Sequence, residues 1–201
     1  MKHSLPNPIL GARFISALAL AVEWHATQPR KGNAIPYVSH LLAVCAAVLE
    51  FGGNEDEAIS ALLHDAIEDA STAAQAADRE ATIREVFGES VVSIVLACTD
   101  GRPDPDGRKA SWEERKQPYV VSLDTKSASA LLVIACDKLH NLTSLVRDLR
   151  RDGLATLKRF RANADQQRWY FAEIGRVLVA RRIALATEYG AMLGQFKELT
   201  R

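Results

Sequence analysis

The sequence has little cysteine and no preponderance of charge of either sign. Only three cysteines occur among 201 residues, Cys45, Cys98 and Cys136; each lies in an apolar run, and no CxxC pair is present. This argues against a disulfide framework or a cysteine-ligated zinc site, and it favours a reducing compartment. The cysteines are therefore expected to be small buried hydrophobic residues.

The charges balance, with 25 Lys and Arg against 25 Asp and Glu. A nucleic-acid partner held by overall positive charge is therefore not expected, although a local basic patch remains compatible with the composition. Hydrophobic residues make up 48% of the chain and charged residues 25%. These proportions, with this length, predict one folded domain with a substantial core.

Long hydrophobic runs are also lacking. The most apolar early run, ISALALAV at residues 15–22, has eight residues and is too short to span a bilayer. Lys2 and Arg13 precede it, so the core of a signal peptide is an alternative. Polar residues 23–25 follow directly and continue the pattern of an amphipathic helix. We therefore expect a cytoplasmic protein with no membrane partner.

The dominant pattern along the chain is helical. Apolar residues recur at spacings of three and four, and no run alternates convincingly with period two. The run 91–98 fits either a helix or a strand by pattern, and its helical surroundings favour a helix. The sequence predicts a single all-α bundle over residues 1–201, with helices from about Phe14 to Gln28, from Pro36 to Gly52, from Asn54 to about Asp69, from Ala81 to Phe87, from Val91 to Cys98, from Ser111 with a kink at Pro118, from about Ser127 to Arg151, and two or three more after Gly153.

The stretch ALLHDAIEDA at residues 61–70 is unusual because ionisable groups stand inside an apolar segment. In a helix, His64, Asp65, Glu68 and Asp69 would share an arc of about 140°. A solvated surface face is the simplest explanation of such a strip. If the strip is buried, removing these charged groups from water costs free energy, and protein cations or a metal ion must offset that cost.

Two further polar residues interrupt apolar helices, His40 in PYVSHLL and Asp137 in LLVIACDKLHNL. Together with His64 and Asp65 they form a mixed nitrogen and oxygen set from three helices. Such a set suits one divalent ion, and its carboxylate share favours Mn²⁺, Fe²⁺ or Mg²⁺ over structural zinc. A bound cation lowers the pKa of water, and the acids one turn beyond Asp65 are placed to orient or deprotonate that water.

Other residues are suited to a phosphorylated ligand. The loop PRKGN places Arg30 and Lys31 beside a glycine, so cations and free backbone amides coincide. Asn141, Ser144 and Asp148 follow Asp137 at intervals that put all four on one helix face.

Four segments, in this order, resemble the HD-domain metal-dependent phosphohydrolases, and in particular the hydrolase domain of the RelA/SpoT alarmone enzymes and the small alarmone hydrolases. The segments are HATQPRKGNAIPYVSH, LLHDAIED, ERK at 114–116 and ACDKLHNL. The resemblance covers about residues 14–175. An HD pair alone is a weak signature, whereas the combination of all four segments is specific.

The resemblance implies an all-helical HD fold and hydrolysis of the 3′-diphosphate of an alarmone nucleotide, either (p)ppGpp-like or an adenosine analogue, with release of pyrophosphate. It implies Mn²⁺ held by His40, His64, Asp65 and Asp137, with Glu68 and Asp69 as catalytic acids. It implies substrate contacts from Arg30, Lys31, Asn141, Ser144, Arg115, Lys116 and Tyr170. His25 and His140 are expected to support these side chains rather than to bind the metal directly.

The chain departs from the family's pattern in three places. The loop GRPDPDGRKASW near the expected site is unlike the family's segment, Ser144 replaces a frequent threonine, and 201 residues leave no room for a synthetase domain. We therefore expect a stand-alone hydrolase. Two alternatives remain at this stage: an HD phosphohydrolase acting on nucleoside monophosphates or dNTPs, and a nucleotide-sensing module without turnover.

Overall fold

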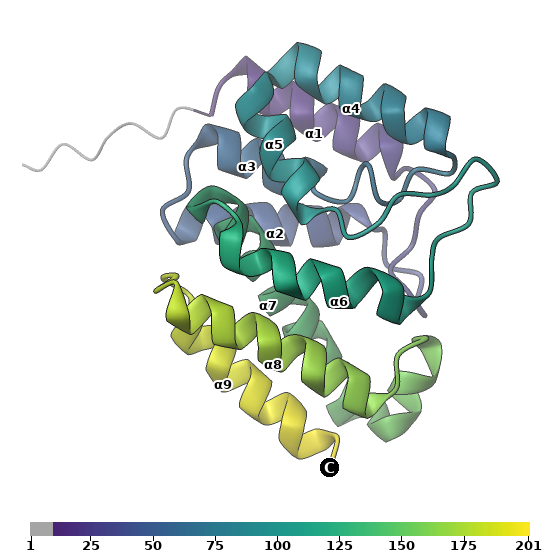
Figure 1. The fold of residues 1–201 in the computed structure, drawn as a ribbon, viewed down its shortest axis with the longest axis vertical. Helices are drawn as coiled ribbons and strands as arrows, with labels where there is room; N and C mark the ends of the chain where they lie inside the picture. The colour runs from purple at the N-terminus through teal and green to yellow at the C-terminus, as the bar shows by residue number, and fades with distance from the viewer. Residues whose placement is uncertain (1–9) are drawn as a thin grey trace, which may run out of the picture.

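The computed structural model describes residues 10–201, and in that range the regular structure is entirely helical (Figure 1). The predicted all-α class is confirmed, and residues 91–98 are helical. The elements are α1 (Ala12–Trp24), α2 (Val38–Glu50), α3 (Glu55–Leu63), α4 (Ala73–Phe87), α5 (Glu89–Cys98), α6 (Trp112–Ser122), the 3₁₀ turn η1 (Leu123–Thr125), α7 (Ala128–Asp152), the 3₁₀ segment η2 (Gly153–Arg159), α8 (Ala164–Ala180) and α9 (Ala186–Leu199).

The long helix α7 forms the centre of the bundle. It packs against α2, α3 and α5 on one side and against α8 and α9 on the other; in Figure 1 it lies behind α6 and α8. By length and composition alone, the segment Ala128–Arg159 could cross a membrane, but 56% of its most apolar window is buried inside the bundle. This segment is therefore the core of the fold, and it carries Asp137 into the interior.

Helix ends follow local chemistry where the sequence has clear caps. Asn54 and Glu57 form a reciprocal capping box at the start of α3, and Ser111 and Glu114 form another at the start of α6. Asn54 and Ser111 are the predicted starts of these two helices, and each box satisfies backbone amides that a helix start leaves free. Gly153 ends α7 with a φ of 65°, a conformation that glycine adopts without a Cβ clash.

The helix predicted from Asn54 to Asp69 is shorter than expected. It ends at Leu63, and residues 64–69 form consecutive turns. In a continuing helix the carbonyl of Ala66 would accept from the amide of Ala70. Instead it accepts from the buried guanidinium of Arg79 at 2.7 Å, and the Ala70 amide turns to the carbonyl of Ile67. The helix itself ends earlier, where the amide of Ala66 bonds to the carbonyl of Leu63 three residues before it, and Arg79 stabilises the turn that follows.

Two other boundaries differ from expectation. Helix α4 begins at Ala73 rather than at residue 81, because Thr72 caps it through the amide of Gln75. Residues 73–80 are mainly alanine and polar, so hydrophobic periodicity does not reveal the first two turns or so of this helix. Helix α1 ends at Trp24, and the chain then turns so that the side chain of His25 bonds to Gln28.

Candidate metal centre and substrate pocket

Four buried or half-buried side chains converge at the junction of α2, α7 and the turn after α3. The Nε2 atom of His40 lies 3.2 Å from Asp137 Oδ1, and the Nε2 atom of His64 lies 2.9 Å from Asp65 Oδ2. The crossed distances are 3.6 Å from His40 to Asp65 and 3.7 Å from His64 to Asp137. One nitrogen from each imidazole and one oxygen from each carboxylate thus surround a common point.

Neighbouring groups fix both imidazole rings. His64 donates from Nδ1 to the carbonyl of Ala61 at 2.8 Å, which directs Nε2 toward the carboxylates. His40 places Nδ1 2.7 Å from Nδ1 of His140, and its own Nε2 also faces the centre. Such contacts on the far side of a ring set the tautomer and the direction of the free nitrogen.

This orientation tests whether the cluster fits a metal ion. Because the carbonyl of Ala61 can only accept, the proton of neutral His64 sits on Nδ1, and Nε2 presents a lone pair. That nitrogen is buried without a hydrogen-bond donor and faces oxygens that are also acceptors. Acceptors that face one another in the interior require a cation between them. The ligand atoms of His40, His64 and Asp65 lie close enough together to form a metal-binding group. Two imidazoles with carboxylate oxygens are a set of ligands that fits a divalent ion.

Both carboxylates are held in the charged state. Burial opposes ionisation of Asp65, but a proton on His64, which occupies the place of the cation when no ion is bound, outweighs it and holds the pKa of Asp65 well below the ordinary value. Burial likewise opposes ionisation of Asp137, and the ammonium group of Lys138 keeps its pKa low. Tyr37 donates its hydroxyl to Asp65 at 2.5 Å and orients that carboxylate.

Glu68 and Asp69 lie on the turn after α3, beside this centre. Gln28 donates to Asp69 at 2.8 Å, and the ammonium group of Lys109 lies 3.4 Å from Asp69 and 3.7 Å from Glu68. Burial, followed by the negative charge of Asp100, raises the pKa of Glu68 to about 7. A carboxylate with that pKa can both accept and return a proton near neutral pH.

A large cavity of about 1230 Å³ opens above the acids. It brings together all nine residues that the sequence assigned to catalysis or substrate binding, from α6, α7, α8 and the loops after α1 and α3. They are Arg30, Lys31, Glu68, Asp69, Arg115, Lys116, Asn141, Ser144 and Tyr170. Ten lysine and arginine side chains line the cavity against three carboxylates, which makes it a site for a polyanion.

Several side chains at the site were not found from the sequence. Gln28 and Lys109 contact Asp69, Tyr37 donates to Asp65, and Lys138 pairs with Asp137. Tyr37 lies three residues before His40 in the segment PYVSH, so the sequence motif that contains His40 also contains this tyrosine. Lys109 lies in the atypical loop, and nothing in its local sequence signals that it reaches the acids.

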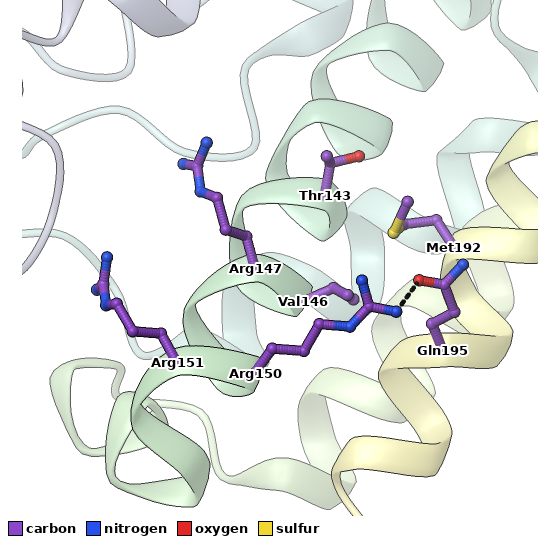
Figure 2. A pocket seen from close by; sticks show the side chains of 7 residues that line it. All are labelled: Thr143, Val146, Arg147, Arg150, Arg151, Met192 and Gln195. Carbon is purple, nitrogen blue, oxygen red and sulfur yellow. Dashed lines mark hydrogen bonds between the residues drawn. The ribbon is translucent and has the colours of Figure 1, made fainter.

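A second, shallower hollow of about 410 Å³ lies between α7 and α9, lined by Thr143, Val146, Arg147, Arg150, Arg151, Met192 and Gln195 (Figure 2). In this view Arg150 turns toward α9 and donates to Gln195, whereas Arg147 and Arg151 extend away from that helix. Of the seven residues, only Arg147 also lines the large cavity. The hollow contains none of the clustered acids or histidines.

Comparison with known proteins agrees with this geometry. The family described as HD domain matches residues 17–166. The guanosine-3′,5′-bis(diphosphate) 3′-pyrophosphohydrolase MESH1 of Xenopus tropicalis is 34% identical over 146 residues, covering 70% of this chain and 71% of that protein. A GTP pyrophosphokinase of Streptomyces coelicolor is 31% identical over 136 residues, which cover 68% of this chain and 15% of the longer protein.

The fold has a close counterpart among solved structures. The structure of a metazoan ortholog of SpoT, which hydrolyses ppGpp and plays a role in starvation responses, superposes with a TM-score of 0.69 at 25% identity. The match covers 96% of this chain and 97% of that one. The chain therefore belongs to the HD-domain family and is an enzyme of the phosphohydrolase type, homologous to the MESH1 small alarmone hydrolases and to the hydrolase domains of SpoT and Rel proteins.

Proposed function

We propose that this protein hydrolyses the 3′-diphosphate of alarmone nucleotides of the (p)ppGpp type and releases pyrophosphate. The observation that carries the proposal is the position of the His40, His64, Asp65 and Asp137 cluster beside two acids at the base of a cationic cavity. The kinship with guanosine-3′,5′-bis(diphosphate) 3′-pyrophosphohydrolases supports the same substrate class. Adenosine analogues carry the same phosphate pattern and belong to the same proposal.

The metal centre would be formed by His40, His64, Asp65 and Asp137, with Mn²⁺ as the proposed ion and Fe²⁺ or Mg²⁺ as alternatives. Two imidazoles with two carboxylates suit any of the three. When bound, such an ion supplies Lewis-acid stabilisation of phosphoryl oxygens and lowers the pKa of water. Chelation should lower the melting temperature, and Mn²⁺ should restore it by binding linkage.

The chain's own side chains would divide the remaining work. Glu68 accepts a proton from the attacking water, while Gln28 and Lys109 hold Asp69 in place beside it. The water oxygen becomes part of pyrophosphate, the bond between the 3′ oxygen and its phosphorus breaks, and the 3′ oxygen takes up a proton. Glu68, with a pKa of about 7, can return that proton in the same cycle.

Side chains that line the large cavity would bind the substrate. Arg30, Lys31, Arg115 and Lys116 bind phosphoryl groups, because guanidinium and ammonium groups form short charge-assisted bonds with phosphate. Asn141 and Ser144 bind the ribose, and the buried ring of Tyr170 lies near the base. We place the activity in the cytoplasm, on a small nucleotide rather than a nucleic acid, with its catalytic core over about residues 14–175.

The direct test is hydrolysis of ppGpp by the Mn²⁺-loaded protein, followed by phosphorus NMR. The proposal predicts pyrophosphate as product and a strongly reduced rate of its release in Glu68→Gln. Release of orthophosphate alone would favour a different phosphohydrolase reaction. Nucleotide binding without any turnover would favour a sensing module. Parallel reactions with Mn²⁺, Fe²⁺ and Mg²⁺, and with guanosine and adenosine substrates, define the ion and the base.

A further inference from the structure

His25 is a buried histidine in the turn that follows α1. Its side chain is 3% exposed, and it is not among the side chains that line the large cavity. Its Nδ1 atom lies 2.7 Å from Oε1 of Gln28, and the amide nitrogen of Gln28 donates to Oδ2 of Asp69 at 2.8 Å. Three side chains thus form one series of hydrogen bonds that ends on a proposed catalytic acid.

The direction of each bond in this series follows from its two ends. Asp69 faces the amide of Gln28 through Oδ2 and the ammonium group of Lys109 through Oδ1, so its carboxylate accepts on both sides. Gln28 must therefore turn its NH₂ group to Asp69 and its oxygen to His25. Because an amide oxygen can only accept, Nδ1 of His25 must carry a proton.

The other ring nitrogen agrees with this assignment. Nε2 of His25 is buried, and no described residue offers it a hydrogen-bond partner. A proton on Nε2 would be a buried donor without an acceptor, which native structures rarely contain. Burial lowers the pKa of His25, which favours the neutral ring. The single proton of the neutral imidazole is therefore on Nδ1.

The ring of His25 has a second neighbour at the site. It stacks on Tyr37, with ring centroids 5.2 Å apart and an angle of 22° between the planes. Tyr37 donates its hydroxyl to Asp65, a proposed metal ligand. One buried imidazole therefore contacts both the side chain that holds Asp69 and the side chain that orients Asp65.

We propose that His25 is a positioning residue for the hydrolysis: its Nδ1 proton sets the orientation of the Gln28 amide, which in turn holds Asp69 in place. The inference rests on the proposed function and deepens it. Without that proton the Gln28 amide can turn over and present its oxygen to the Asp69 carboxylate, and two acceptors that face each other repel. His25 thus acts on the reaction through Gln28.

Nuclear magnetic resonance tests the tautomer without any turnover. Long-range correlation of the imidazole protons with the ring nitrogens shows which nitrogen carries the proton, in the full chain loaded with diamagnetic Mg²⁺. The signals of His25 are those that disappear in His25→Asn. We expect the proton on Nδ1. A proton on Nε2 would overturn the proposal, whether or not the protein releases pyrophosphate.

Two substitutions separate the hydrogen-bond donor from the ring. His25→Phe keeps a ring to stack on Tyr37 but removes the donor, whereas His25→Asn places an amide nitrogen where Nδ1 lies and can still donate. In ppGpp hydrolysis by the Mn²⁺-loaded chain, His25→Phe should lower kcat by about 10–100-fold with little change in KM, and His25→Asn should recover most of that loss. Equal kcat in the parent and His25→Phe, or equal losses in both variants, would overturn the positioning role.

A double-mutant cycle with Gln28→Leu tests the route. If His25 acts through Gln28, His25→Phe should change kcat by less than about twofold once residue 28 is leucine. Losses that multiply in the double variant would overturn that route.

Melting temperatures show whether each variant is folded. Should His25→Phe not fold, His25→Asn decides the matter: kcat close to that of the parent supports the donor role, and a loss of about tenfold or more overturns it. Absence of pyrophosphate from the parent's reaction would refute the proposed function. Normal pyrophosphate release with the His25 proton on Nε2 would overturn this inference alone.

Discussion

The guanidinium of Arg30 donates to the side-chain oxygen of Asn141 at 3.0 Å, joining two motifs that lie 111 residues apart. The amide nitrogen of Asn141 in turn donates to Asp137 at 2.5 Å. One side chain thus couples the loop proposed to bind phosphate to a proposed metal ligand. Because its two ends bind groups of opposite charge, the orientation of the Asn141 amide is fixed.

Replacing Asn141 should therefore affect both metal and substrate. Asn141→Ala removes the donor to Oδ1 of Asp137 and the side-chain acceptor of Arg30, and we expect Mn²⁺ affinity to fall by about 10–100-fold. Titration of Mn²⁺ followed by electron paramagnetic resonance measures this. Thr143→Ala, on the same helix but bonded only to the carbonyl of Leu139, is the matched control. Equal Mn²⁺ affinity in both variants would contradict the coupling.

The pH dependence of kcat/KM should reflect the ionisation of Glu68. Its raised pKa of about 7 means that the carboxylate, which is the basic form, predominates only above that pH. The parent's kcat/KM should therefore rise with pH up to about 7 and then level off. Glu68→Gln should lower kcat by about 10²–10⁴-fold and abolish the rising limb. A rising limb that persists in the variant would assign the titration to another group.

Lys109 should influence the same pH dependence, because it shifts the pKa of Glu68. Its ammonium group lies within 4 Å of both acids and lowers the pKa of Glu68. Lys109→Ala should move the rising limb to higher pH and reduce kcat/KM by about 10–100-fold, while Lys109→Arg retains most activity. Arg102→Ala is the control, because Arg102 lies in the same loop and pairs with Glu80 outside the cavity. An unshifted profile in Lys109→Ala would show that Lys109 does not act on Glu68.

Arg79 should matter for stability. It is buried and donates to the backbone carbonyls of Ala66 and Trp24, which tie the turn after α3 to α1. Arg79→Ala should lower the free energy of unfolding by about 2–4 kcal/mol, because both carbonyls lose their side-chain donor. Arg84→Ala, on the same helix with an exposed ion pair, should leave the denaturation midpoint unchanged. Urea denaturation of the two variants gives the comparison, and equal midpoints would contradict this role for Arg79.

The sequence predicted the convergence of His40, His64, Asp65 and Asp137 because each of them interrupts an apolar segment at a position that burial makes costly. His40 and Asp137 are recognisable on this basis from the sequence. The turn at residues 64–69 could not be predicted in the same way. Within this turn the carbonyl of Ala66 accepts from Arg79, which comes from another helix, and the local sequence does not reveal that contact.

The contact of Lys109 with Glu68 and Asp69 could not be predicted from the sequence either. It depends on the path of the loop 101–110, in which Gly107 has a φ of 77° and approaches the carbonyl of Ser71 so closely that a Cβ atom would lie 2.6 Å from it. Neither the spacing nor the composition of the loop encodes that approach. Caps and apolar periodicity are local signals, whereas this docking depends on contacts between distant segments.

The central claim is that two histidines and two aspartates from separate segments bind one divalent ion. A crystal structure of the Mn²⁺-soaked protein, with anomalous data collected above the manganese absorption edge, tests it directly. We predict one anomalous peak about 2.0–2.3 Å from His40 Nε2, His64 Nε2, Asp65 and Asp137. An absence of density at that point, with Asp137 turned away from the histidines, would contradict the account.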